Sequence, residues 1–158
     1  MDNDLLESFV GDKYQTYYQQ KWQQDKSINF NLAAFFLGIF WMCYRKMYLT
    51  AFLMLAAVTV FDLVMMHMLG AEYEQTSAIV YNFAVAAISG LLGNYFYKQF
   101  SLKKSNQIAA NTSNPQYISG VLASKGGTTW IGAIFMPLLL LVLVACFYAL
   151  FAPDWYTI

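Results

Sequence analysis

Residues 130–151, WIGAIFMPLLLLVLVACFYALF, form an unbroken apolar stretch without a charged side chain. About 20 residues of α-helix, each rising about 1.5 Å, cross the hydrocarbon core of a bilayer. Two other stretches have comparable length: residues 47–69, MYLTAFLMLAAVTVFDLVMMHML, and residues 78–97, AIVYNFAVAAISGLLGNYFY. The sequence therefore predicts an all-α membrane protein with three transmembrane helices.

The composition supports a membrane protein and argues against a soluble one. Hydrophobic residues make up 59% of the chain and charged residues only 11%, whereas ordinary soluble domains carry roughly 25% charged residues. Too few polar side chains are present to cover a soluble globule. The formal net charge of zero hides a segregation of charge, because five acidic residues gather at the N-terminus: Asp2, Asp4, Glu7, Asp12 and Asp25. We expect no nucleic-acid partner.

Basic residues flank the apolar stretches on one side only. The short connection at residues 70–77 carries Glu72 and Glu74 but no Lys or Arg, and the tail after Ala152 carries only Asp154. Lys and Arg beside a span are retained in the cytoplasm, so the pattern predicts a multi-pass protein with a cytoplasmic N-terminus. The basic residues are Lys13, Lys21, Lys26, Arg45, Lys46, Lys98, Lys103, Lys104 and Lys125.

Residues 98–129 form the longest polar segment, which we expect to be a cytoplasmic basic loop. The segment carries four Lys and no acidic residue, a composition that suits anionic lipid headgroups. The lipid bilayer, and its anionic lipids in particular, is therefore the first expected partner. The residues predicted to contact headgroups are Arg45, Lys46, Lys98, Lys103 and Lys104.

Residues 28–44, INFNLAAFFLGIFWMCY, are apolar but contain Asn29, Asn31 and Gly38. Only two residues separate this stretch from the next one, and a hairpin between two full spans needs more loop than that. We therefore predict a short interfacial or re-entrant helix that belongs to a membrane domain at residues 28–158. The alternative is four transmembrane helices with an external N-terminus, which would move three lysines outside and break the charge pattern.

Residues 1–27 are expected to form a cytoplasmic amphipathic helical segment. Leu6, Phe9, Val10 and Tyr14 recur near helical spacing, and polar residues fill the positions between them. Such an aromatic face could lie on the membrane or pack beneath the helical bundle.

Several short motifs of the chain resemble those of a known family. They are Phe9-Val10-Gly11, the run FNLAAFFLGIFW at residues 30–41, YRKMY at residues 44–48, GNY at residues 93–95 and KGG at residues 125–127. Together they are similar to the small bacterial membrane proteins called domain of unknown function 2628. Ile39 departs from the pattern, because many members have proline there. The resemblance implies a bacterial cytoplasmic (inner) membrane protein and no established activity.

Four polar residues of the apolar stretches form a candidate intramembrane site: Asp62, His67, Asn82 and Asn94. A carboxylate within a span is costly and usually faces protein or water. A hydrogen bond to a neighbouring helix is the interpretation we favour for Asp62, and a proton or ion role is the alternative. His67 lies among three Met residues, but consecutive helical side chains point about 100° apart, so we expect no metal site.

Small residues in the second long stretch predict a close helix contact. They recur one turn apart, a spacing that lets another backbone approach closely. Packing within the chain is favoured over a dimer contact. The residues are Ala86, Ser89, Gly90 and Gly93.

Catalytic signatures are absent from the sequence. It contains a single His and no HExxH, GxSxG or phosphate-binding GxxxxGK[ST] motif, so we expect no enzyme and no cofactor. The leading hypothesis is a non-enzymatic accessory or scaffold protein of the membrane, with a membrane-protein partner or as a homo-oligomer. The alternatives are a subunit of an oligomeric small-solute, proton or ion transporter or channel, and a protein for anionic-lipid sensing or membrane remodelling.

Overall fold

The computed structural model describes residues 2–23, 29–111 and 114–152, and these residues form helices, turns and connections without a strand. The expected all-α class is therefore confirmed for the described residues. In chain order the elements are α1 (Asp2–Val10), the π-helical turn η1 (Tyr14–Tyr18), α2 (Gln19–Gln23), α3 (Leu32–Leu37), α4 (Ile39–Tyr44), α5 (Tyr48–Leu69), α6 (Ala71–Ala110), α7 (Pro115–Lys125) and α8 (Trp130–Phe151).

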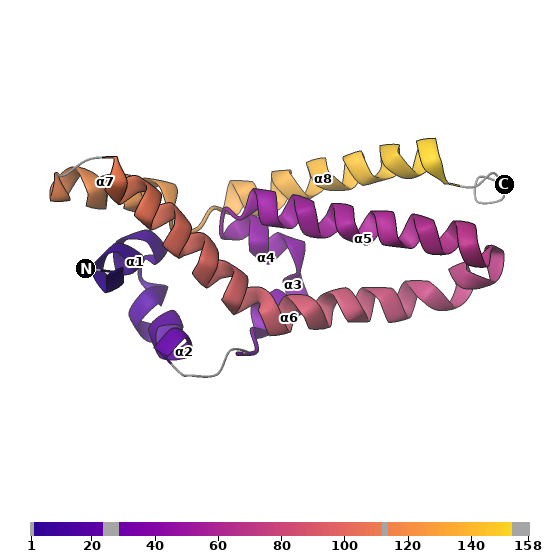
Figure 1. Cartoon of the computed structure of the whole chain (residues 1–158), viewed down its shortest axis with the longest axis horizontal. Coiled ribbons are helices and arrows are strands. Elements are labelled where there is room, and N and C mark those ends of the chain that lie inside the picture. The colour runs from indigo at the N-terminus through magenta and orange to yellow at the C-terminus, as the bar shows by residue number, and fades with distance from the viewer. Residues whose placement is uncertain (1, 24–28, 112–113, 153–158) are drawn as a thin grey trace.

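Three long helices run beside one another and extend away from a cluster of shorter ones (Figure 1). We call α5, residues 71–97 of α6, and α8 the rods, and we call residues 2–23, 98–111 and 114–125 the head. Of the described helices, α5 and α8 have the length and apolar composition to cross a membrane. Most of their surface is exposed, including Phe52, Phe61, Phe135 and Leu139. Two candidate spans therefore correspond to two of the three expected ones.

The third expected span, residues 78–97, lies inside α6. The helix α6 continues beyond this span at both ends. The helix has 40 residues, which at about 1.5 Å per residue is about twice the thickness of a hydrocarbon core of about 30 Å. Residues 98–110, expected as the start of a loop, are helical, and α7 occupies much of the rest. No Gly or Pro interrupts residues 98–110, so the polar composition there reflects solvent exposure and not a break in the helix.

The described part of the predicted re-entrant segment, residues 29–44, contains two short helices joined by a sharp bend. Asn31 caps α3 by accepting a hydrogen bond from the Ala34 amide, at 2.9 Å. The bend between α3 and α4 lies at Gly38, whose φ of 48° is unfavourable for residues with a side chain. Each helix has six residues and is about 9 Å long. One packs on α6 and the other on α5 and α8, so neither is a span by itself.

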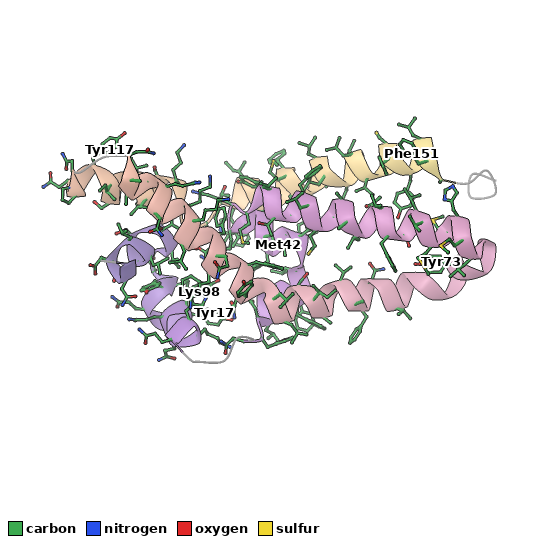
Figure 2. All side chains as sticks on the ribbon, viewed as in Figure 1. Tyr17, Met42, Tyr73, Lys98, Tyr117 and Phe151 are labelled. Carbon is green, nitrogen blue, oxygen red and sulfur yellow. The ribbon has the colours of Figure 1, made fainter. Side chains whose placement is uncertain are left out.

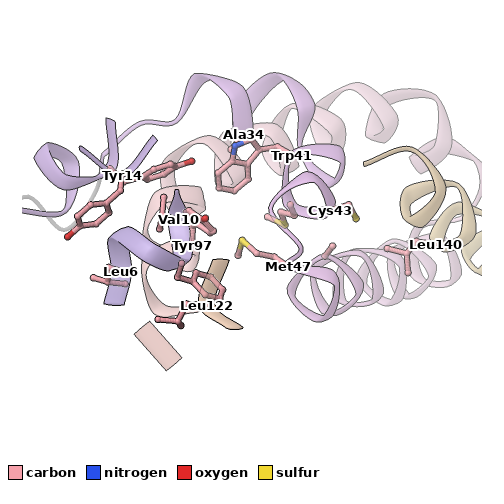
Figure 3. Close-up of a cluster of buried hydrophobic side chains, with 14 residues drawn as sticks. Leu6, Val10, Tyr14, Ala34, Trp41, Cys43, Met47, Tyr97, Leu122 and Leu140 are labelled. Carbon is pink, nitrogen blue, oxygen red and sulfur yellow. The ribbon is translucent and has the colours of Figure 1, made fainter. Parts of the chain in front are cut away.

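The core lies where the head meets the rods. The N-terminal segment, expected as one amphipathic helix, is divided into α1, η1 and α2, with a break at Gly11, where φ is 76°. The apolar positions expected on its inner face, including Leu6, Phe9 and Val10, are buried against α6 and α7. Figure 3 shows Leu6 and Val10 near Tyr97 and Leu122. Burial of this face explains why the segment folds onto α6 and α7.

Candidate functional site

Arg45, the residue after α4, lies in a cage of tyrosine rings. Its guanidinium carbon is 4.9 Å from the ring centre of Tyr18, 5.1 Å from that of Tyr97 and 5.9 Å from that of Tyr44. Trp22 extends the cage, because its ring lies 5.0 Å from Tyr18 and 5.8 Å from Tyr97. Only 6% of the Arg45 surface is exposed. The cage therefore brings together a turn, the end of a short helix and the middle of α6.

The charge of Arg45 is only partly compensated within the described residues. Its Nε and Nη1 atoms are buried and have no hydrogen-bond partner there. A desolvated cation over an aromatic face gains about 2 kcal/mol, whereas the effective cost of removing an ion from water is several kcal/mol. Two free donors on a buried cation are therefore suited to an anion.

A row of buried hydroxyl groups continues from this cage along α6. Tyr97, Ser101 and Ser105 are spaced four residues apart and so share one face of the helix. All three side chains are buried, and none of their hydroxyl groups makes a hydrogen bond of standard geometry within the described residues, although the Tyr97 hydroxyl interacts with Ser101 and Arg45. The regular spacing is visible in the sequence. The burial of these hydroxyl groups is not, because it depends on the packing of α1 and η1 against α6.

Arg45 also lines a groove of about 980 Å³ between η1, the α3–α4 pair and the start of α8. One end has side chains with nitrogen or hydroxyl donors: Lys13, Thr16, Tyr17, Tyr18, Tyr44 and Arg45. The opposite wall is mostly apolar: Leu32, Ala33, Phe36, Leu37, Phe40, Trp41, Ala133 and Ile134. Asn31 and Trp130 complete the lining. The groove is thus amphipathic, with a basic end and a hydrocarbon-like wall.

The five residues predicted to contact lipid headgroups occupy different environments. Arg45 is enclosed by the cage. The Lys46 Nζ donates a hydrogen bond to the Ser124 carbonyl at 3.0 Å and so joins the turn after α4 to the head. The Lys98 Nζ donates to the Trp22 carbonyl at 3.0 Å and so joins two parts of the head. Lys103 and Lys104 are exposed on α6. Figure 2 labels Lys98 on the part of α6 that belongs to the head.

The predicted intramembrane polar residues do not form one site. Asp62 on α5 accepts hydrogen bonds from the hydroxyl groups of Tyr73 on α6 and Tyr148 on α8, so it connects all three rods. His67 is exposed and bonds through Nδ1 to the Leu63 carbonyl. Asn82 lies on the exposed side of α6. Among the described residues, no group of three His, Cys, Asp or Glu could hold a metal ion.

Asn94, the fourth of these residues, lies at the opposite end of the rods, where it holds the start of α3. The Asn31 Nδ2 donates to the Asn94 Oδ1 at 2.8 Å, and the Asn94 Nδ2 donates to the Asn29 carbonyl at 3.1 Å. The Asn31 amide donates to the Gly90 carbonyl at 2.7 Å. These bonds fix the apolar wall of the groove against α6.

The predicted small-residue face packs within the chain, mainly on α3. A Cβ at Gly93 would lie 2.8 Å from the Cβ of Ala34, and one at Gly90 would lie 2.9 Å from the Cβ of Phe35. Ser89 is buried and donates a weak hydrogen bond to the Met54 sulfur on α5, at 3.7 Å. Ala86 is half-buried. Close approach at the two glycines therefore positions α3, which the sequence did not identify as the neighbour.

The sequence matches the family described as a protein of unknown function, DUF2628, over residues 9–102. The chain belongs to this family. The segment shared with DUF2628 contains the cage and all of the groove except its α8 residues. No curated protein and no solved structure matches the chain. Sequence reasoning missed Tyr18 and Tyr97, because nothing in their spacing indicates that they surround Arg45. It also missed Lys13, which lines the same groove.

Proposed function

We propose that this DUF2628 protein is a multi-pass protein of the bacterial cytoplasmic membrane that acts without catalysis, as an accessory or scaffold protein. The observation that carries the proposal is the division between long, exposed apolar rods and a compact aromatic and basic head at one end of them (Figure 1). Exposed apolar surface of this extent is suited to lipid. The head is suited to contacts outside the hydrocarbon region.

The charge distribution supports a cytoplasmic head and N-terminus. Each basic residue that the structure describes lies on the head or at its junction with the rods, while the turn at the other end, residues 70–74, contributes two acidic residues and none that is basic. Lys and Arg flanking a span favour the cytoplasm. The basic residues concerned are Lys13, Lys21, Arg45, Lys46, Lys98, Lys103, Lys104 and Lys125.

The lengths of the helices support three spans with a re-entrant pair. In this arrangement α5, residues 78–97 of α6, and α8 cross the bilayer, and the α3–α4 pair enters it and returns. The two short helices are joined at a bend and pack on different rods, which suits a segment that does not cross. The C-terminal part of α6, together with α7, then presents Lys103, Lys104 and Tyr117 on the cytoplasmic side. This surface could bind a membrane-protein partner or anionic lipid.

Membrane extraction and cysteine labelling test the proposal. The full chain, with Cys43 and Cys146 replaced by Ala, is expected to stay in the membrane pellet at alkaline pH because its rods lie in hydrocarbon. Single cysteines replacing Asp12 or Asn106, both exposed on the head, should react with a membrane-impermeant maleimide only after the inner face is opened.

A cysteine replacing Met68, exposed near the far end of α5, is the matched control and should react in intact cells. Release of the chain by alkali would contradict a membrane protein. Labelling of positions 12 and 106 from opposite sides would instead support four spans.

A further inference from the structure

The groove beside Arg45 combines a buried cation with an apolar wall. We propose that it holds one anionic membrane lipid, whose headgroup is bound by Arg45 and Lys13 and whose hydrocarbon chain lies against Phe36. The proposal rests on the proposed function to the extent that the groove must face a bilayer. It goes further by naming the chemical class of the ligand and its site.

The buried guanidinium supplies the strongest reason for an anion. Arg45 is nine-tenths buried, lines the groove, and has two nitrogen atoms without a hydrogen-bond partner within the described residues. A buried guanidinium with unpaired donors attracts the negative charge of a phosphate group beside it. The tyrosine cage holds the side chain in place, so little conformational freedom remains to be lost on binding.

Other donors surround the same end of the groove. Lys13 is exposed and adds a second positive charge, and Thr16 and Tyr18 add hydroxyl groups. Burial raises the pKa of Tyr18 above its ordinary value, although the neighbouring Arg45 acts in the opposite direction. Its hydroxyl group is therefore protonated at neutral pH and can donate. None of the described lining residues is acidic, so the charge at this end is positive.

The apolar wall distinguishes a lipid from a soluble anion. Phe36 is 73% exposed and Leu32 is 63% exposed, yet both line the groove. Exposed apolar side chains next to a cation are of little use to inorganic phosphate, whereas an acyl chain would cover them. A ligand with both an anionic and a hydrocarbon part is the one that matches both ends of the groove.

The position of the groove suggests that such a lipid enters sideways from the cytoplasmic leaflet. Its apolar wall is formed by α3, α4 and the start of α8, and it is continuous with the exposed apolar surface of α8. Trp130, 73% exposed at the start of α8, packs on Tyr44 with ring centres 4.9 Å apart. Aromatic side chains of this kind are common at headgroup level, which places the basic end where headgroups lie.

Native mass spectrometry of the purified full chain in a neutral detergent tests the proposal. Phosphatidylglycerol and phosphatidylcholine with the same acyl chains are added in turn, and inorganic phosphate and glycerol phosphate are added in parallel. We expect one phosphatidylglycerol per chain, retained about tenfold more tightly than phosphatidylcholine, since a charge-assisted hydrogen bond contributes about that factor. Equal retention of the two lipids would overturn the proposal. Displacement of phosphatidylglycerol by an equal concentration of inorganic phosphate would also overturn it, because the acyl chain would then contribute nothing to binding.

Variants with matched controls locate the lipid. Lys13→Gln and Arg45→Gln should each reduce phosphatidylglycerol retention about tenfold, whereas Lys103→Gln, which removes an exposed charge outside the groove, should not. Phe36→Ser should weaken both lipids, and Phe135→Ser, which changes a similarly exposed Phe on α8, should weaken neither.

Arg45→Gln also disturbs a buried cage, so loss of binding is interpreted only if that variant unfolds at the temperature of the parent. If Arg45→Gln unfolds at a lower temperature than the parent, the variants of the exposed residues Lys13 and Phe36 test the site instead. Unchanged lipid retention in both Lys13→Gln and Phe36→Ser would overturn the proposed site. Alkaline extraction of the membranes from which the chain is purified separates the two proposals. A chain that stays in the membrane at alkaline pH but retains no anionic lipid after purification would leave the proposed function standing and remove this inference.

Discussion

At the scale of single residues, Asn94 and Arg45 show how the surroundings of a polar side chain decide its role. In the sequence Asn94 is one of several polar residues in apolar stretches, and Arg45 and Lys46 are an adjacent basic pair. In the structure Asn94 binds the start of α3 through its side chain. Arg45 is enclosed by tyrosine rings, whereas Lys46 adopts a positive φ of 60° and caps the end of α7. Adjacent residues in one turn thus have different functions.

Replacing Asn94 by Leu should destabilise the protein by about 1–3 kcal/mol, because the buried Asn31 side chain then loses its acceptor. Thermal unfolding in detergent, followed by circular dichroism, measures the loss. Gln99→Leu is the control, since Gln99 is exposed on the same helix, and it should leave the unfolding temperature nearly unchanged. Equal unfolding temperatures for Asn94→Leu and the parent would show that the amide pair does not hold α3.

At the scale of elements, α7 and α1 are joined by a close backbone contact. The Gly127 amide donates a hydrogen bond to the Phe9 carbonyl at 2.7 Å. At Gly126 an added Cβ would overlap the same carbonyl oxygen. A backbone atom at the end of a helix cannot move aside as a flexible side chain can. The contact therefore requires glycine at position 126.

Gly126→Ala should separate α7 from α1 and lower the unfolding temperature of the head. Gly120→Ala is a matched control within α7, since nothing lies within 4 Å of a Cβ there; alanine at that site should stabilise the helix by about 0.5–1 kcal/mol. The rate at which a protease cleaves the head of the folded protein should rise in Gly126→Ala and not in Gly120→Ala. Far-ultraviolet circular dichroism measures the helix content of both variants as a second readout. If both behaved alike, the close contact between Gly126 and Phe9 would be wrong.

At the scale of the whole molecule, the head is held to the rods largely through aromatic side chains that include buried tyrosines. Burial raises the pKa of Tyr18 above its ordinary value of 10.0, with Arg45 opposing the shift, and burial also raises the pKa of Tyr14, with Glu7 and Asp4 adding to it. In both cases the folded state favours the protonated hydroxyl group. The stability that depends on this protonation is complete below about pH 10, the pKa of an unfolded tyrosine, and is lost as the pH rises further.

We therefore expect the head to detach from the rods above about pH 10, while the rods remain helical. Near-ultraviolet circular dichroism reports the aromatic packing and far-ultraviolet circular dichroism reports the helices. Tyr18→Phe should move the alkaline transition to higher pH, because the folded state then no longer resists one ionisation. Tyr117→Phe, which changes an exposed ring of α7, should not move it. An unchanged midpoint in Tyr18→Phe would count against this explanation.

The sequence by itself determined the helical class, the apolar helices α5 and α8, and the apolar face of the N-terminal segment. Each follows from local composition and periodicity, which do not depend on distant parts of the chain. The same reasoning predicted a short interfacial or re-entrant helix at residues 28–44 without the bend at Gly38. It treated residues 98–110 as a loop, because polar composition does not distinguish a loop from an exposed helix.

Only the tertiary structure decided which side chains meet. Tyr18, Arg45 and Tyr97 are separated by many residues, and their contact depends on α1 and η1 folding back over α6. Asp62 likewise meets tyrosines from two other helices, while Asn94 serves α3 at the other end. Periodicity specifies the face on which a residue lies but not the partner of that face. The amphipathic groove at Arg45 is therefore a property of the packing, and the apolar and basic composition from which it is built is a property of the sequence.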